Sequence, residues 1–167
     1  MIKTVVDIKL NLPNFALTAQ DMLQTGNEAI ALLKIRVYDK NKALSGQAFK
    51  PYSTRPFTVE TGSDTAKRLK PKGGKKTAKG VFYQGGYAEY KRASTGSSDV
   101  NLTLSGNLLQ SIQVVDADSK GFTISPTGTA VKYAEKVDAA RPFIGITDDE
   151  LDILKQVIID KLLGGRR

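Results

Sequence analysis

Apolar and polar residues alternate near the start of the chain. The run from Lys3 to Leu12, KTVVDIKLNL, is rich in Val, Ile and Leu, and Pro13 follows it. A period of two residues is typical of a β-strand with one buried face, and proline ends such a ladder. The pattern therefore predicts an edge or central strand over residues 3–12.

A helical period replaces this alternation after residue 17. Thr18 stands three residues before Asp21, which is the spacing of a helix N-cap with an acidic first turn. The residues that then recur at helical spacing, up to about Tyr38, are Met22, Leu23, Ile30, Leu33 and Val37. Gly26 lies on the same stripe. Two interpretations stand: glycine lets another backbone approach closely, or it only costs helix stability, roughly 1 kcal/mol relative to alanine.

The periodicity fades between residues 41 and 98. Two parts of this span have apolar material that could pack onto the rest of the chain, GQAFKPYS (46–53) and the aromatic set Phe82, Tyr83, Tyr87 and Tyr90. The piece between them, residues 61–80, has almost nothing to bury. A long stretch without structure is typical of a functional arm or of local disorder. We expect a mobile arm at about 58–82.

Regular patterns return at Val100. Residues 107–111 suit a short helix with Leu108 and Leu109 as its buried pair. A hairpin follows, in which Ile112, Val114 and Asp116 alternate, residues 118–121 make the turn, and Phe122–Ile124 alternates back. A helix over 129–137, with Val131, Ala134 and Val137 inward, leads to an extended segment at 141–146 because Pro142 disfavours a helical residue before it.

The final helix has the strongest pattern. Thr147 and Glu150 have the spacing of a capping box, and Asp148 and Asp149 suit the electropositive first turn. The apolar residues on one stripe are Leu151, Leu154, Val157, Ile158 and Leu162. Gly164 is placed where a glycine follows a helix end.

These elements predict one α+β domain over residues 1–167. We expect a small, mostly antiparallel sheet packed against the long N-terminal helix and the C-terminal helix, with a long basic loop as an arm. A chain of 167 residues is long enough to bury a core of this kind.

The composition removes most catalytic chemistry. The chain has neither cysteine nor histidine, so thiolate ligands, disulfides and the commonest general base are absent. The acidic residues nearest to one another are Asp148, Asp149, Glu150 and Asp152, and capping already accounts for them. Residues 72–77 lack the spacing of a phosphate-binding loop. We expect no enzyme, no cofactor and no metal, and also no membrane span or signal segment.

Positive charge is concentrated in the predicted arm. The net charge is +8, and seven basic residues without an acidic one account for all but one unit of it: Lys67, Arg68, Lys70, Lys72, Lys75, Lys76 and Lys79. Such a segment could dock on an acidic protein surface or neutralise the phosphates of DNA without sequence preference. It could also be a solvated loop without a partner, and all three interpretations stay open.

Several motifs occur in an order that resembles a known family. They are Gly46–Ser53, the run Tyr87–Arg92, the element LSGNLLQSI at 104–112, Tyr133–Glu135, and the corner Arg141-Pro142-Phe143-Ile144-Gly145-Ile146. Together they cover about half the chain, and they resemble the virion morphogenesis and tail-completion proteins of tailed bacteriophages. The chain departs from many relatives at Val137–Ala140, where they carry a histidine or a Tyr-Gly pair.

The resemblance implies a structural role. Such proteins form a ring, commonly a hexamer, at the head-proximal end of the tail tube and join it to the head connector. The implied partners are other copies of this chain, the tail-tube protein and the connector or stopper protein, with packaged DNA nearby and no membrane. The implied location is the virion, and the host cytoplasm during assembly. The corner of Arg141, Pro142 and Phe143 is then a candidate subunit boundary. The alternative is a nucleic-acid-binding accessory protein that uses the basic arm.

Overall fold

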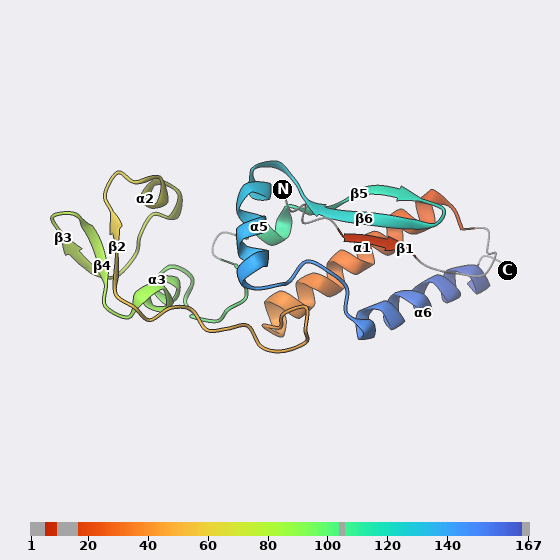
Figure 1. Cartoon of the computed structure of the whole chain (residues 1–167), viewed down its shortest axis with the longest axis horizontal. Coiled ribbons are helices and arrows are strands. Elements are labelled where there is room, and N and C mark those ends of the chain that lie inside the picture. Colours follow the sequence, from red (N-terminus) through yellow and green to blue (C-terminus); the bar gives the residue numbers. More distant parts are fainter. Residues whose placement is uncertain (1–5, 10–16, 104–105, 165–167) are drawn as a thin grey trace.

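The chain forms an elongated α+β molecule with two lobes (Figure 1). The structure is a computed structural model, and it describes residues 6–9, 17–103 and 106–164. The main lobe contains the elements described before residue 40 and those from residue 107 onward. The distal lobe, at the left of Figure 1, spans residues 57–95.

A three-stranded antiparallel sheet forms one layer of the main lobe. Its strands are β1 (Val6–Lys9), β6 (Gly121–Pro126) and β5 (Ile112–Asp118), in that spatial order. The strand predicted at 3–12 is therefore present at its centre, while its flanks and Pro13 lie outside the described residues. Helix α1 (Ala19–Lys34) packs on β5 and β6 and also contacts α6 (Asp148–Gly164).

The sheet and the helices that pack on it all contribute side chains to the main core. Its fully buried side chains include Met22, Leu33, Val37, Ile124, Phe143, Leu154 and Ile158. Phe49, from the segment that leads to the distal lobe, joins the same core. The expected core position of Phe143 is confirmed.

Both predicted helix starts are confirmed. The Thr18 hydroxyl accepts from the Asp21 amide at 3.2 Å, and the Asp21 carboxylate accepts from the Thr18 amide at 2.9 Å. At α6 the Glu150 amide donates to the Thr147 hydroxyl at 3.2 Å, and Glu150 accepts from the Thr147 amide at 2.9 Å. Each reciprocal pair satisfies backbone donors that a helix start leaves unpaired.

Gly26 is a site of close packing between α1 and the sheet. A Cβ atom there would lie 2.6 Å from Val114 Cγ2 and 3.0 Å from Phe122 Cδ2. A close approach is present at this glycine, but side chains of the sheet make it and not the backbone that the first interpretation named. Leu23, which was expected on the buried stripe, is instead 36% exposed. Beyond α1 the chain continues as the π-helical turn η1 (Ile35–Asp39).

The predicted hairpin is present, but its alternation is wrong after Val114. The register of β5 against β6 shifts between Val114 and Asp116, which is a β-bulge. Val115 is 51% exposed, Asp116 is also exposed, and Ala117 takes the next inward position. An extra residue reverses the faces of the residues that follow it.

The short helices follow the predictions with small differences. Leu108 and Leu109 are buried in α4 (Asn107–Gln110), as expected. The predicted helix at 129–137 is the 3₁₀ turn η2 (Gly128–Ala130) followed by α5 (Val131–Ala140), in which Ala134 is buried but Val131 is 40% exposed. Helix α6 runs through Gly164, which the pattern had placed after its end.

The distal lobe differs most from the sequence-based expectation. Residues 41–98 do contain regular structure: β2 (Phe57–Glu60), α2 (Asp64–Leu69), β3 (Lys75–Thr77), β4 (Gly80–Tyr83) and α3 (Gly86–Thr95). The strands form a second antiparallel sheet in the order β2-β4-β3. Residues 61–80 bury almost nothing where their side chains are described, as expected, but they are not without structure. The aromatic residues on either side of them, Phe57, Tyr83 and Tyr90, pack together and make this segment part of a small folded lobe.

Two chain segments connect the lobes. The outgoing segment covers residues 50–56 and the returning one residues 96–103, and they run between the same two lobes in Figure 1. The distal lobe is therefore an insertion between η1 and α4 of the main lobe.

Candidate functional site

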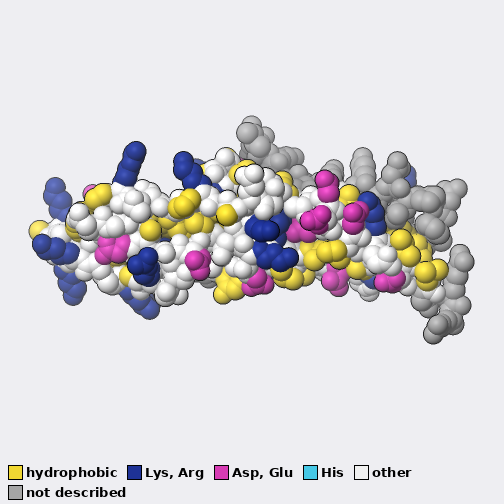
Figure 2. All heavy atoms as spheres, turned by 90° about the horizontal axis from the view of Figure 1, so that it is seen from below, with side chains coloured by type: hydrophobic (Ala, Val, Ile, Leu, Met, Phe, Trp, Pro, Cys, Tyr) yellow, Lys and Arg dark blue, Asp and Glu magenta, His cyan; other side chains and the backbone are white. Residues whose placement is uncertain are grey.

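The basic residues predicted as a partner- or DNA-facing arm lie on the surface of the distal lobe. Those with exposed, described side chains are Lys67, Lys70, Lys72, Lys75, Lys76 and Lys79. Arg68 belongs to α2, and its side chain lies outside the described residues. Figure 2 shows Lys and Arg side chains gathered at this end of the molecule.

The folding of the lobe spreads these charges over several directions. Lys75 and Lys76 are consecutive in β3, opposite Phe82 and Val81 of β4, so their side chains leave opposite faces of the sheet. Lys70 caps α2 in the left-handed conformation, at φ +40°. Lys72 is held by its carbonyl oxygen, which accepts from the Tyr83 hydroxyl at 2.8 Å. The structure thus brings the charges to one end without forming a single binding cleft.

An aromatic cluster fills the interior of the distal lobe. Phe57 stacks on Tyr83 with ring centroids 5.5 Å apart, and Tyr90 meets Tyr83 edge-on at 5.2 Å. Tyr87 lies 5.6 Å from Tyr90. Tyr83 and Tyr90 are 0% and 1% exposed, so their rings are unavailable for stacking on nucleic-acid bases. Of the expected aromatic set, these two therefore serve the fold.

Burial also makes the phenol groups of these tyrosines weaker acids. It raises the pKa of Tyr83, Tyr90 and Tyr52, because the phenolate form loses its water. Burial, together with the neighbouring Tyr52 and Tyr90, raises the pKa of Tyr87 to about 12.

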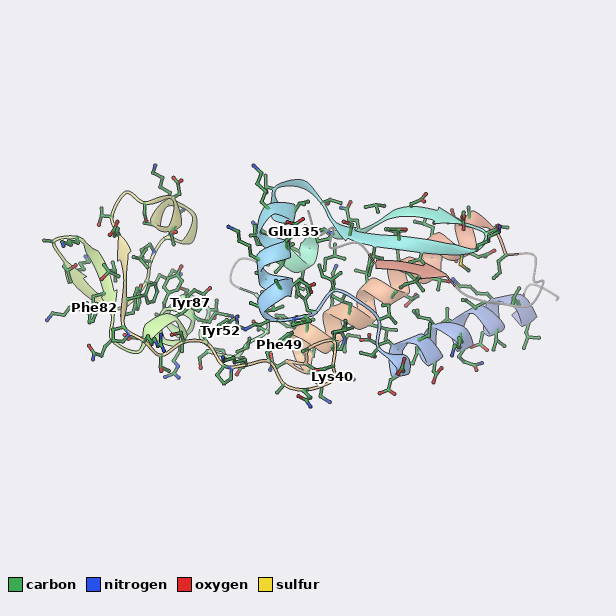
Figure 3. All side chains as sticks on the ribbon, in the orientation of Figure 1. Lys40, Phe49, Tyr52, Phe82, Tyr87 and Glu135 are labelled. Atoms are coloured by element: carbon green, nitrogen blue, oxygen red, sulfur yellow. The ribbon has the colours of Figure 1, made fainter. Side chains whose placement is uncertain are left out.

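The predicted corner lies where the lobes join. The guanidinium of Arg141 donates to the Lys50 carbonyl at 3.3 Å and to the Pro51 carbonyl at 3.4 Å. Its carbon lies 5.0 Å from the ring centroid of Tyr52. Tyr52 in turn meets Tyr87 of α3 edge-on at 5.0 Å (Figure 3). Arg141 thus links the corner to the outgoing segment and, through Tyr52, to the distal lobe.

The rest of the corner is held by the main lobe. The Asp138 carboxylate accepts from the amides of Phe143 at 2.8 Å and Ile144 at 2.9 Å. The Pro142 carbonyl accepts from the Leu44 amide at 2.8 Å. Asp138 belongs to α5, so the end of this helix fixes the backbone of the corner.

Two buried charged groups were not found by sequence reasoning. The first is Arg36, whose Nε donates to Glu150 Oε1 at 2.8 Å and whose Nη2 donates to the carbonyls of Phe143 and Gly145. The sequence explained Glu150 by capping alone. In the structure its Oε2 makes the cap and its Oε1 makes this buried ion pair. The sequence does carry one signal of this burial: Arg36 lies on the apolar stripe of the N-terminal helix, and residues on such a stripe face the core.

The second is Lys91 of α3, which is 2% exposed. Its ammonium group donates to Asn101 Oδ1 at 3.0 Å and to the Thr103 carbonyl, which ties α3 to the returning segment. Burial lowers the pKa of Lys91, and Asp99 opposes this effect. The Arg141 and Lys91 contacts fasten the two connecting segments at the junction.

The described residues offer little for other chemistry. Over residues 6–9, 17–103 and 106–164 no three His, Cys, Asp or Glu side chains come together as metal ligands would. Within the same ranges no helix has the length and apolar character needed to cross a membrane.

Comparisons with known proteins add no relative. No family model matches the chain, and neither a curated protein nor a solved structure matches it.

Proposed function

We propose that the chain is a structural subunit of a tailed-phage virion. It forms a ring at the head-proximal end of the tail tube and joins the tube to the head connector. The observation that carries the proposal is the ordered set of motifs, from Gly46–Ser53 through the 104–112 element to the corner at 141–146. The role is assembly and not catalysis, in the virion and, before that, in the host cytoplasm.

The elongated, two-lobed shape supports this role. A joining subunit has to contact its neighbours in the ring and also the layers above and below. Two lobes with separate cores, connected at a fastened junction, give one chain surfaces that face different neighbours. A ring then arises when one heterologous contact repeats around an axis until it closes.

The proposal is tested by disrupting the coding sequence in a phage genome that carries it. Electron microscopy of the lysate should show DNA-filled heads and separate tails, and purified protein added to the lysate should restore joined particles. Negative-stain images of the purified protein should show rings. Normal joined particles from the disrupted phage would refute the proposal.

The exposed lysines of the distal lobe favour a second candidate, a DNA-binding accessory protein. Six lysines with described, exposed side chains at one end of the molecule could neutralise phosphates. This candidate requires the purified protein to bind DNA of any sequence, with affinity falling steeply as salt rises. Weak binding that does not respond to Lys75→Gln/Lys76→Gln would dismiss it.

A further inference from the structure

The returning segment contains a strained residue where it reaches the main lobe. The segment leaves α3 and covers residues 96–103 (Figure 1). Near its end Leu102 has a φ of +52°, in the left-handed region. Leucine adopts that region rarely, because its Cβ atom crowds the following carbonyl oxygen. Such a conformation persists only where the surrounding contacts hold it.

The two residues beside Leu102 close a tight turn around it. Asn101 Oδ1 accepts from the Thr103 amide at 3.2 Å, and the Thr103 hydroxyl donates to the Asn101 carbonyl at 2.8 Å. An asparagine side chain that bonds two residues ahead imitates a backbone turn. These bonds shape the turn, but they are local and do not attach it to either lobe.

The distal lobe holds this turn through Lys91. The ammonium group of Lys91 donates to Asn101 Oδ1 at 3.0 Å and to the Thr103 carbonyl, so one cation bridges the two sides of Leu102. Lys91 is 2% exposed. A buried cation has lost its water, and giving up its remaining acceptors is therefore unfavourable. Lys91 consequently resists the opening of the turn.

The main lobe holds the same turn through Leu102 itself, whose side chain is partly buried and packs against the main core. The outgoing segment meets it there as well. Burial raises the pKa of Tyr52, and the Arg141 charge and a hydrogen bond with the main chain of Leu102 oppose this effect. The left-handed conformation thus lets Leu102 face the main core while its two neighbours bond the distal lobe.

We propose that the turn Asn101-Leu102-Thr103 is a catch that fixes the angle between the two lobes. While the Lys91 bonds are in place, Leu102 stays left-handed and the distal lobe keeps one orientation. When those bonds open, Leu102 relaxes to an ordinary backbone conformation, the returning segment changes direction and the distal lobe swings at the junction. The strain at Leu102 favours release, and Lys91 opposes it. This inference does not rest on the proposed function, because it concerns the single chain.

Distances between spin labels on the two lobes test the catch. The chain has no cysteine, so Asn27→Cys in α1 and Thr65→Cys in α2, both at exposed residues, provide its two label sites. Double electron–electron resonance should give one narrow distance distribution for the labelled protein. Lys91→Met keeps an unbranched side chain but removes the donors, so the distribution should broaden. The matched control Lys79→Met, an exposed lysine of the same lobe, should leave it narrow.

Hydrogen exchange at the Thr103 amide measures the catch directly, because this amide donates to Asn101 Oδ1. It should exchange about tenfold faster in Lys91→Met than in the wild type. Asn101→Ala removes the same acceptor from outside the distal lobe and should also broaden the distance distribution. Near-ultraviolet circular dichroism shows whether the tyrosine cluster is intact, and Asn101→Ala decides the question if Lys91→Met disturbs the fold.

Two substitutions of Leu102 separate strain from ordinary flexibility. Leu102→Ala and Leu102→Gly both remove the side chain that packs against the main core. Glycine adopts a positive φ freely and alanine does not. The catch therefore predicts a narrower distance distribution for Leu102→Gly than for Leu102→Ala. In a turn without strain the order would be reversed, because glycine is the more flexible residue.

Three results would overturn the proposal. They are a broad distribution in the labelled wild type, a narrow distribution in folded Lys91→Met and Asn101→Ala, and a broader distribution for Leu102→Gly than for Leu102→Ala. None of these measurements depends on the joining of heads to tails, so the catch and the proposed function fail separately.

Discussion

The packing of α1 on the sheet leaves no room for a side chain at Gly26. Changing Gly26→Ala would place a methyl group 2.6 Å from Val114 Cγ2. Alanine favours the helix by roughly 1 kcal/mol, but overpacking a core costs about 1–3 kcal/mol. We expect the variant to be less stable, with a lower urea midpoint at an unchanged slope.

Asn27→Ala is the matched control because Asn27 is the next residue of α1 and is exposed. It gains the same kind of helix propensity without a clash, so its urea midpoint should equal or exceed that of the wild type. A Gly26→Ala variant as stable as this control would show that α1 and the sheet can separate without loss.

Local residues of this chain were predictable, and long-range partners were not. The caps at Thr18 and Thr147 and the buried Phe143 follow from spacing within a few residues. The Arg36–Glu150 pair joins positions 114 residues apart, so no local pattern could reveal it. The same limit hid the burial of Lys91, because its acceptors belong to the returning segment.

At the scale of elements, Arg141 connects the corner to the outgoing segment. Its bonds to the Lys50 and Pro51 carbonyls are long, at 3.3 and 3.4 Å, and its position over Tyr52 contributes about 0.5–1 kcal/mol. We expect Arg141→Met to lower global stability by about 1 kcal/mol. Hydrogen exchange should rise more clearly at the Ala88 amide, which donates to the Ser53 carbonyl.

Lys136→Met, an exposed change on α5 nearby, should leave that exchange rate unchanged. An Arg141→Met variant with wild-type exchange at Ala88 would mean that the junction does not depend on this arginine. In that case the corner would be free to act as a subunit boundary, the role that the family resemblance implies.

The tyrosine cluster makes the distal lobe sensitive to alkali. The folded lobe holds the pKa of Tyr87 at about 12, whereas an unfolded chain releases that proton near pH 10. Above pH 10 the folded state binds more protons than the unfolded one, so its stability falls as pH rises from 10 toward 12. Near-ultraviolet circular dichroism should report loss of the cluster in this window.

Tyr87→Phe removes the latest-titrating of these groups and should reduce the alkaline loss. The comparison is made at equal temperature and salt, with tyrosinate absorbance recorded in parallel. A cluster signal that persists in both proteins beyond pH 12 would contradict the assigned cause.

The elements that sequence patterns missed are short or irregular. Strand β3 reads Lys-Lys-Thr, with no apolar residue, and exists because β4 pairs with it. The bulge after Val114 reverses the alternation that the hairpin pattern predicted. By contrast α6, with 17 residues, a capping box and a stripe, was predictable as a whole.

At the scale of the whole molecule, the two cores differ greatly in size. Among the residues that the structure describes, the distal core has three buried hydrophobic residues, Val59, Tyr83 and Tyr90, whereas the main core has sixteen. We expect heating to disrupt the distal lobe first. The near-ultraviolet signal of the buried Tyr83 and Tyr90 in that lobe should be lost at a lower temperature than the far-ultraviolet signal of α1 and α6.

Coincident transitions by both probes would instead show one cooperative unit. That result would favour the single domain expected from the sequence, with the junction at Arg141 and Lys91 strong enough to couple the cores. Separate transitions would favour two units of unequal stability.

The double connection between the lobes has a mechanical consequence. A lobe joined by one linker can rotate about it, but a lobe joined by an outgoing and a returning segment resists that rotation. Arg141 fastens the first segment and Lys91 the second, so the remaining freedom is bending at the junction. In the proposed ring, every copy would therefore hold its distal lobe in nearly the same angular relation to its own main lobe. If the ring forms, variants that loosen either fastening should broaden the range of curvatures seen among the rings.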